Sequence, residues 1–334
     1  MTDDFSRGGQ AETATPPDRR PDPTQEELLL QPYQGQRPPA PGWFTRAVET
    51  PFRTRTITVE GTDIVYQQWG DAAKPGLLLV HGNGAHAGWF DFIAPFLAED
   101  WNVVAANFSG MGDSGWREAY TFSGFCAEQI AVCEDAGLFD HAQKPVIVAH
   151  SFGGLVSLLT AIEHGDRFAG AIIVDSHIEP PGEDRPRPPR RTRPNRVYPD
   201  LASALARFRL APPQPCENDF AVDYIARHSL KETQDEDGRP GLVWKFDPFI
   251  FSKLLAEWDT MDLTRLETKC PILFMRGAES SLVTPEVAAY MASLQDPPVP
   301  TVSIPQAHHH IMLDQPLAFV AAIRGILTGW PGGR

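Results

Sequence analysis

The chain has few cysteines, an excess of acidic over basic residues and no long hydrophobic run. Its 334 residues include 4 cysteines and 29 Lys and Arg against 43 Asp and Glu, and the formal net charge at pH 7 is −14. A chain this acidic lacks the basic surface that nucleic acid or an anionic membrane requires. No stretch approaches the roughly 18 consecutive apolar residues of a membrane span. The sequence therefore argues against nucleic acid, an anionic membrane surface and a membrane span, and its charge gives no further information about the substrate; the small-molecule substrate that we expect follows from the motifs below.

The cysteines and the N-terminus bear on the cellular compartment, and the hydrophobic content bears on the size of the core. They stand at positions 126, 133, 216 and 270, spacings that match neither a disulfide framework nor a C-x-x-C metal site. The N-terminus lacks the basic and then apolar pattern of a secretory signal. We therefore expect reduced thiols and a cytoplasmic protein. With 42% hydrophobic residues, the chain can bury the core of one large domain or of a domain with an insertion.

The strongest motif is a serine between a short β-branched run and a helix-like pattern. Residues 146–148 predict a strand, and Ser151 stands at the apex of the sharp turn after it. Such a turn requires small residues two positions before and after the serine, which here are Ala149 and Gly153. The turn exposes the Ser151 hydroxyl as a nucleophile and points the Phe152 N–H and the helix N-terminus at the same place. A nucleophile beside an anion site favours acyl transfer.

A second motif is an apolar run that ends in His-Gly-Asn-Gly. Residues 77–80 predict a buried parallel strand, and the glycine-rich loop after it lets backbone N–H groups face a ligand. The N–H of Asn83 is then the second oxyanion donor beside that of Phe152. The alternative is an ordinary tight turn between a strand and a helix.

A third motif is a loop with three consecutive histidines, residues 308–310, between a predicted strand and a helix that starts near Pro316. A catalytic base sits on such a loop, because its imidazole must reach the serine hydroxyl. Metal binding is the alternative. Neighbours in a tripeptide rarely converge on one ion, however, and no H-x-x-x-H or C-x-x-C pattern supports it. We expect no metal and no cofactor.

These motifs and the Ser-Gly-Met-Gly-Asp-Ser run at residues 109–114 occur in an order typical of one superfamily. Over about residues 52–328 the chain resembles the capped α/β-hydrolases, close to bacterial serine esterases and carbon–carbon-bond hydrolases. The resemblance implies the α/β-hydrolase fold, with a mostly parallel central sheet, helices on both faces and an inserted helical cap. It also implies that His309, seven residues before Pro316, is the base and that Asn83 supplies an oxyanion N–H.

The acid is the point at which the sequence departs from this family. The usual position, three residues past Gly277, holds Ser280, which cannot stabilise an imidazolium as a carboxylate does. Two carboxylates are candidates instead. Asp175 follows the predicted strand 171–174, where relatives such as dehalogenases place the acid, and Glu279 lies one residue short of the usual place. We favour Asp175, with Glu279 as the alternative; each is otherwise a turn or cap carboxylate.

The alternation of strands and helices from residue 56 predicts the parallel sheet independently, with ligands at the carboxyl ends of its strands. We expect an α/β core at residues 43–176 and 262–334. A polar, proline-rich and flexible tail is expected at residues 1–42. A cap insertion is expected at residues 177–261, its aromatic side chains roofing an apolar pocket. The role of the Pro- and Arg-rich run within the insertion stays open.

The sequence therefore predicts a serine hydrolase that cleaves an apolar ester through Ser151, His309 and Asp175. Two alternatives remain. A carbon–carbon hydrolase acting on a β-diketone or ring-fission product uses the same residues. A non-catalytic ligand-binding protein on the same scaffold gains weight from Ser280, which stands where an acid is usual. The oligomeric state is not predicted.

Overall fold

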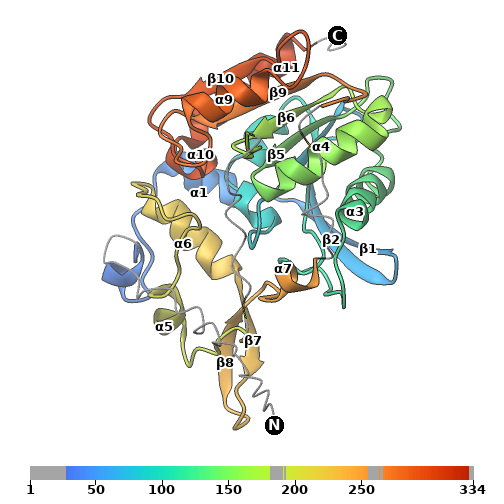
Figure 1. Ribbon diagram of the computed structural model, residues 1–334. Coiled ribbons are helices and arrows are strands. Elements are labelled where there is room, and N and C mark those ends of the chain that lie inside the picture. The colour runs from blue at the N-terminus through green and yellow to red at the C-terminus, as the bar shows by residue number, and fades with distance from the viewer. Residues whose placement is uncertain (1–27, 181–190, 192, 255–262, 264–265, 331–334) are drawn as a thin grey trace, which may run out of the picture.

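The computed structural model describes residues 28–180, 191, 193–254, 263 and 266–330. A central sheet of eight strands has the order β1-β2-β4-β3-β5-β6-β9-β10 (Figure 1). β2 pairs antiparallel with β1 and β4, and from β4 to β10 all neighbours are parallel. The strands are β1 (Arg53–Val59), β2 (Thr62–Trp69), β3 (Gly76–Val80), β4 (Asn102–Ala106), β5 (Val146–His150), β6 (Gly170–Val174), β9 (Ile272–Gly277) and β10 (Thr301–Ile304).

Apolar side chains fill both faces of this sheet. Leu77 and Leu79 of β3 belong to one buried cluster, and Leu78 and Val80 belong to the other. Both faces are covered by helices, which explains why the central strands are apolar throughout and confirms the predicted arrangement. The first cluster includes α1 (Gly42–Val48), α2 (Ala94–Leu97) and α11 (Pro316–Thr328); the second includes α3 (Phe122–Asp135), α4 (Phe152–His164) and α9 (Pro285–Ala292).

The segment between β6 and β9 leaves the sheet and forms a separate group of elements. Figure 1 shows α5, α6 and the β7–β8 hairpin on the opposite side of the molecule from α9 and α11. The expected insertion is helical, but the structure also contains this hairpin. The Asp235 carboxylate accepts the N–H groups of Asp237 and Arg239 at 3.0 and 2.8 Å, which closes its turn. The elements are α5 (Leu201–Leu205), α6 (Asp219–His228), β7 (Leu230–Gln234), β8 (Pro240–Trp244) and α7 (Ile250–Lys253).

The chain before α1 contacts this segment. Leu30 is only 1% exposed and precedes the short helix η2 (Gln31–Tyr33). The Tyr33 hydroxyl donates to Asp219 at 2.5 Å, and Arg227 donates to the carbonyl oxygen of Gly35 at 2.8 Å. Tyr33 and Gly35 of the expected tail thus contact α6, while residues 1–27 lie outside the described residues. Most of the Pro- and Arg-rich run, at 181–190 and 192, also lies outside them.

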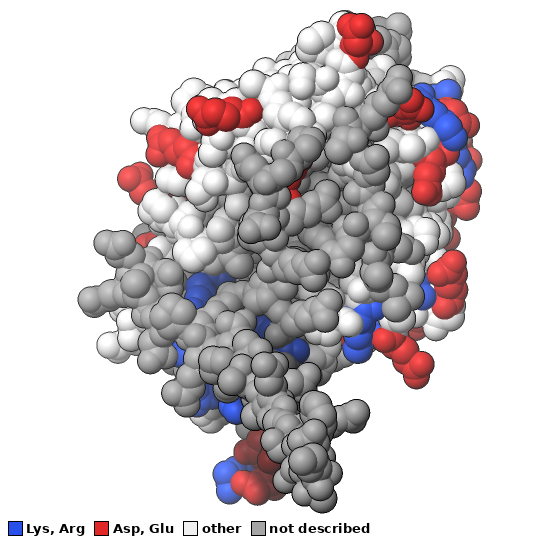
Figure 2. Space-filling view, in the orientation of Figure 1, with Lys and Arg blue, Asp and Glu red and all other residues white. Residues whose placement is uncertain are grey.

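The surface is consistent with the acidic composition. Figure 2 shows acidic side chains spread along the margins of one face, with Lys and Arg among them. Among the described residues, no helix combines the length and the apolar character needed to cross a membrane.

Candidate active site

Ser151 occupies a strained turn between β5 and α4. Its backbone has φ 54 and ψ −123, a conformation that costs a non-glycine residue of order 1–3 kcal/mol. The turn is crowded: a Cβ on Gly153 would lie 2.3 Å from the carbonyl oxygen of His81, and one on Gly154 would lie 1.8 Å from the Ser176 hydroxyl oxygen. The backbone contact leaves no room for a side chain at Gly153, which explains why the sequence motif has glycine two positions after the serine.

Ser151, His309 and Asp175 form a continuous hydrogen-bonded chain. The Nε2 atom of His309 lies 3.0 Å from the Ser151 Oγ, and its Nδ1 lies 2.8 Å from Asp175 Oδ1. The imidazole is 2% exposed and the Asp175 side chain 0%. A carboxylate only accepts hydrogen bonds, so Nδ1 carries the proton and Nε2 presents its lone pair to the serine hydroxyl. The structure therefore brings together three residues that the sequence placed at separate strand ends.

Asp175 is held by further donors from the loop after β9. The N–H of Gly277 donates to its Oδ2 at 2.8 Å, and the Ser280 hydroxyl donates to its Oδ1 at 2.6 Å. Glu279 does not join this group. Its carboxylate is 55% exposed and lies 3.5 Å from His308. Of the two candidate acids, Asp175 is thus the one beside His309.

The two segments that carry the predicted oxyanion donors lie next to Ser151. Phe152 is the first residue of α4, so its N–H belongs to the helix N-terminus. The loop with Asn83 passes close to the serine, because a Cβ on Gly82 would lie 3.1 Å from the Ser151 Cβ. The N–H of Gly84 donates to the Met111 sulfur at 3.3 Å, which fixes this loop to the one after β4.

Two further histidines, His150 and His310, lie next to His309, and neither is predicted from the sequence to have a role of its own. The ring centroids of His150 and His310 each lie 4.7 Å from that of His309. Burial lowers the pKa of both imidazoles well below the usual value, so both are neutral at pH 7. Within the described part of the chain, these three residues are the group able to offer metal-ligand atoms within 4.8 Å of one another. His308, by contrast, contacts Asp314 at 3.1 Å.

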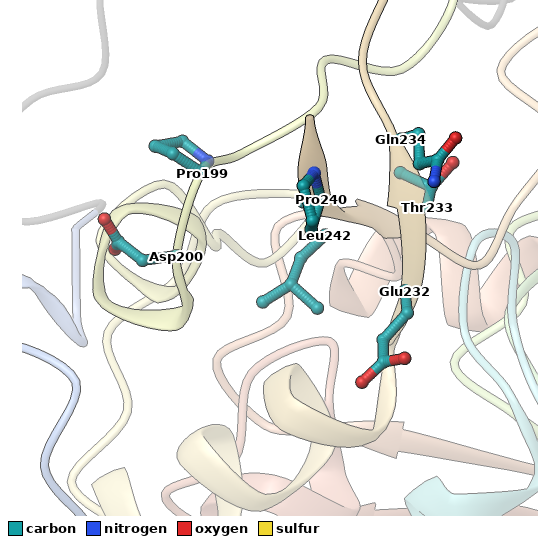
Figure 3. Close-up of a pocket in the computed structure, with 8 residues that line it drawn as sticks. Pro199, Asp200, Glu232, Thr233, Gln234, Pro240 and Leu242 are labelled. Atoms are coloured by element: carbon teal, nitrogen blue, oxygen red, sulfur yellow. The ribbon is translucent and has the colours of Figure 1, made fainter. Parts of the chain in front are cut away.

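A cleft of about 790 Å³ lies elsewhere, between the start of α5 and the β7–β8 hairpin. Figure 3 shows Pro199 and Asp200 on one side of it and the hairpin strands on the other. Ser151 and His309 are not among the described residues that line it, so the cleft and the hydrogen-bonded chain are separate features.

Comparison with known proteins places this geometry in a family. Residues 77–323 match the model of the alpha/beta hydrolase family. The hydrolase YugF of Bacillus subtilis, itself uncharacterized, is 24% identical over 124 residues, 36% of this chain but only 44% of that protein. A pimeloyl-[acyl-carrier protein] methyl ester esterase of Neisseria meningitidis is 25% identical over 270 residues, 78% of this chain and 95% of the esterase.

Solved structures agree on the fold. The structure of an E-2-(acetamidomethylene)succinate hydrolase superposes with a TM-score of 0.65 at 18% identity, over 84% of this chain and 99% of that one. The sheet order, the strained serine turn and the match over residues 77–323 lead to the same result. The chain belongs to the alpha/beta hydrolase family.

Proposed function

We propose that the chain is a serine hydrolase that cleaves carboxylic esters by transferring the acyl group to water. The observation that carries this proposal is the hydrogen-bonded chain from Asp175 through His309 to Ser151, with the serine on a strained turn at a helix N-terminus. These are the parts required for an activated serine nucleophile.

The reaction proceeds through an acyl-enzyme. His309 Nε2 takes the proton of the Ser151 hydroxyl as Oγ attacks the ester carbonyl carbon. The N–H groups of Asn83 and Phe152 stabilise the oxyanion, while Asp175 orients the imidazole and stabilises its charged form. The intermediate collapses, the carbon–oxygen bond to the alcohol breaks, and the alcohol leaves with the proton from His309. A water molecule repeats the sequence, releasing the acid and restoring Ser151.

An ester substrate is supported by the name of the Neisseria meningitidis relative, which matches most of the chain. An apolar acyl or alcohol group is supported by aromatic side chains from the segment between β6 and β9. Phe251 packs edge to face on Phe152, next to the serine, with ring centroids 6.2 Å apart. On this proposal the segment is a cap whose Phe251 reaches the acyl-transfer site.

The test is turnover of p-nitrophenyl acetate and butyrate by the wild type and three variants. We expect Ser151→Ala and Asp175→Asn to lose activity by about 10⁴-fold or more, because the serine, the histidine and the aspartate act as one unit. Glu279→Gln is the matched control, a neighbouring carboxylate that does not reach His309, and it retains activity. Labelling of Ser151 by a fluorophosphonate measures the nucleophile independently.

Other outcomes redirect the proposal. Loss of activity in Glu279→Gln, with Asp175→Asn active, contradicts the choice of acid while leaving the serine mechanism in place. Turnover of a β-diketone or ring-fission product without ester turnover indicates the carbon–carbon hydrolase. No turnover and no labelling of Ser151 indicate a ligand-binding protein.

A further inference from the structure

Three buried imidazoles converge from two separate parts of the chain. His150 ends β5, whereas His309 and His310 lie on the loop before α10 (Ile311–Asp314). Each is at most 4% exposed, and one ring nitrogen from each lies within 4.8 Å of the other two. A tetrahedral zinc ion with bonds of 2.0–2.1 Å to nitrogen needs ligand nitrogens about 3.3 Å apart. The ring nitrogens, which lie within 4.8 Å of one another, would need to approach by at most about 1.5 Å to hold one such ion.

The partners of His309 and His150 suit metal ligands. His309 donates its Nδ1 proton to Asp175 at 2.8 Å, leaving Nε2 as the coordinating atom. This carboxylate–histidine pair is the usual outer contact of a metal-bound imidazole, which it orients and makes more basic. His150 lies with its Nε2 3.0 Å from the backbone carbonyl oxygen of His309, so its ring is tied to the loop that carries the other two.

His310 supplies the independent observation. The His310 side chain is only 4% exposed, and both of its ring nitrogens are buried and make no hydrogen bond. Leaving a buried polar group unsatisfied costs about 1–3 kcal/mol, so such a group calls for a ligand. Its ring packs on Trp89 at 5.3 Å and on His150 at 5.4 Å between centroids.

The sequence predicted no metal site, but the fold adds His150 to two of the neighbouring histidines, and we propose that His150, His309 and His310 bind one divalent transition-metal ion of the zinc type. Imidazole nitrogens suit Zn²⁺, Cu²⁺ and Ni²⁺ rather than Mg²⁺ or Ca²⁺. The Ser151 hydroxyl oxygen, 3.0 Å from His309 Nε2, or a water molecule completes a four-coordinate site. The bound ion occupies the lone pair of His309 that accepts the serine proton. Metal binding therefore inhibits ester hydrolysis, a consequence that depends on the proposed function, whereas binding itself does not.

The test uses the full chain, purified without a histidine tag and stripped of metal with EDTA. Zinc chloride is titrated in a calorimeter, and cobalt chloride is added to follow the intense visible absorption of tetrahedral Co²⁺. We expect one ion per wild-type chain and at least about a 100-fold weaker affinity in His310→Phe, which keeps the ring shape but has no ligand atom. His308→Gln is the matched control, because His308 is the neighbouring histidine but contacts Asp314 instead. We expect this variant to bind Zn²⁺ as the wild type does.

The second readout is inhibition. The rate of ester hydrolysis with zinc is compared with the metal-free rate of the same protein. We expect zinc to inhibit the wild type and His308→Gln but not His310→Phe. If His310→Phe fails to fold by circular dichroism, His310→Gln replaces it. Absence of stoichiometric Zn²⁺ binding, or equal loss of affinity in His308→Gln, overturns the proposal. Calorimetry measures Zn²⁺ binding even if the protein hydrolyses no ester. A failure of the proposed esterase function can therefore be told apart from a failure of the proposed metal site.

Discussion

At the scale of single residues, Ser280 holds the carboxylate that lies beside His309. Its hydroxyl, at the position where relatives carry a carboxylate, donates to Asp175 Oδ1 at 2.6 Å. The same oxygen of Asp175 holds His309. On the proposed mechanism Ser280 is a positioning residue, which acts through the carboxylate and helps to keep it charged and aimed at the imidazole.

We expect Ser280→Ala to lower kcat for p-nitrophenyl butyrate about 10-fold and to leave KM unchanged, because a hydrogen bond to a charged group is worth about 1.5–3 kcal/mol. Ser280→Thr retains the hydroxyl and most of the activity, and Ser281→Ala, on the exposed neighbour, is the control. A purely structural role for Ser280 predicts instead equal losses for Ala and Thr, or a change in melting temperature with kcat intact.

The positions of Ser151, His309 and Asp175 follow from the sequence because residues after parallel strands meet at one edge of the sheet. Their close surroundings do not follow in the same way. Asp175 adopts φ 45, an unusual value for a non-glycine residue, and no sequence rule predicts that this conformation turns its side chain toward His309. The contact of His309 with His150 is equally hidden, because 159 residues separate the two and only the fold brings them together.

At the scale of elements, the strands and helices of the core could be predicted, whereas the β7–β8 hairpin was missed. Its signal was present in the Asp-Glu-Asp-Gly turn at residues 235–238, but Pro240 at the start of β8 weakened a strand prediction. Gly238 in this turn has φ 78, a conformation that side chains with a Cβ rarely adopt.

Two glycines with open space around them offer a matched pair of substitutions. A Cβ on Gly238 or on Gly325 meets nothing within 4 Å, but Gly238 has positive φ whereas Gly325 lies inside α11. We expect Gly238→Ala to lower the free energy of unfolding by about 1 kcal/mol. Gly325→Ala raises it by about 0.5–1 kcal/mol, because alanine is the better helix former. Urea unfolding measures both; a loss of stability in Gly325→Ala contradicts the helical assignment there.

At the scale of the whole molecule, buried ionisable groups set the dependence of stability on pH. Burial lowers the pKa of His81 to about 4 and that of His86 to about 3. Each imidazole stays neutral in the folded chain and takes up a proton on unfolding below its ordinary pKa of about 6.5. The stability that each contributes is therefore complete above about pH 6.5. It is lost at about 1.4 kcal/mol per pH unit as the pH falls toward the folded-state pKa.

The buried carboxyl of Asp91 changes the stability with pH in the opposite direction. It is 3% exposed, its Oδ2 accepts the Tyr224 hydroxyl at 2.8 Å, and its Oδ1 has no hydrogen-bond partner. Burial raises the pKa of this carboxyl from 3.8 to about 6. Between these values the folded chain keeps a proton that the unfolded chain releases, so stability falls as the pH rises through the interval. At pH 7 the buried carboxylate is charged and destabilises the fold.

Variants at these two sites are expected to change the pH profile in opposite directions. Asp91→Asn keeps an acceptor for Tyr224 and removes the buried charge, so we expect a gain of up to about 3 kcal/mol at pH 7 that disappears by about pH 4. His86→Gln removes a group that takes up one proton on unfolding. Between about pH 6 and 4 the free energy of unfolding of this variant therefore falls less steeply with decreasing pH than that of the wild type, by about 1.4 kcal/mol per pH unit. Urea unfolding across about pH 4–7.5 measures both slopes in metal-free buffer. A loss of packing changes the free energy of unfolding equally at every pH and leaves its slope against pH unchanged. If the plots of both variants run parallel to that of the wild type, neither group titrates as its burial implies.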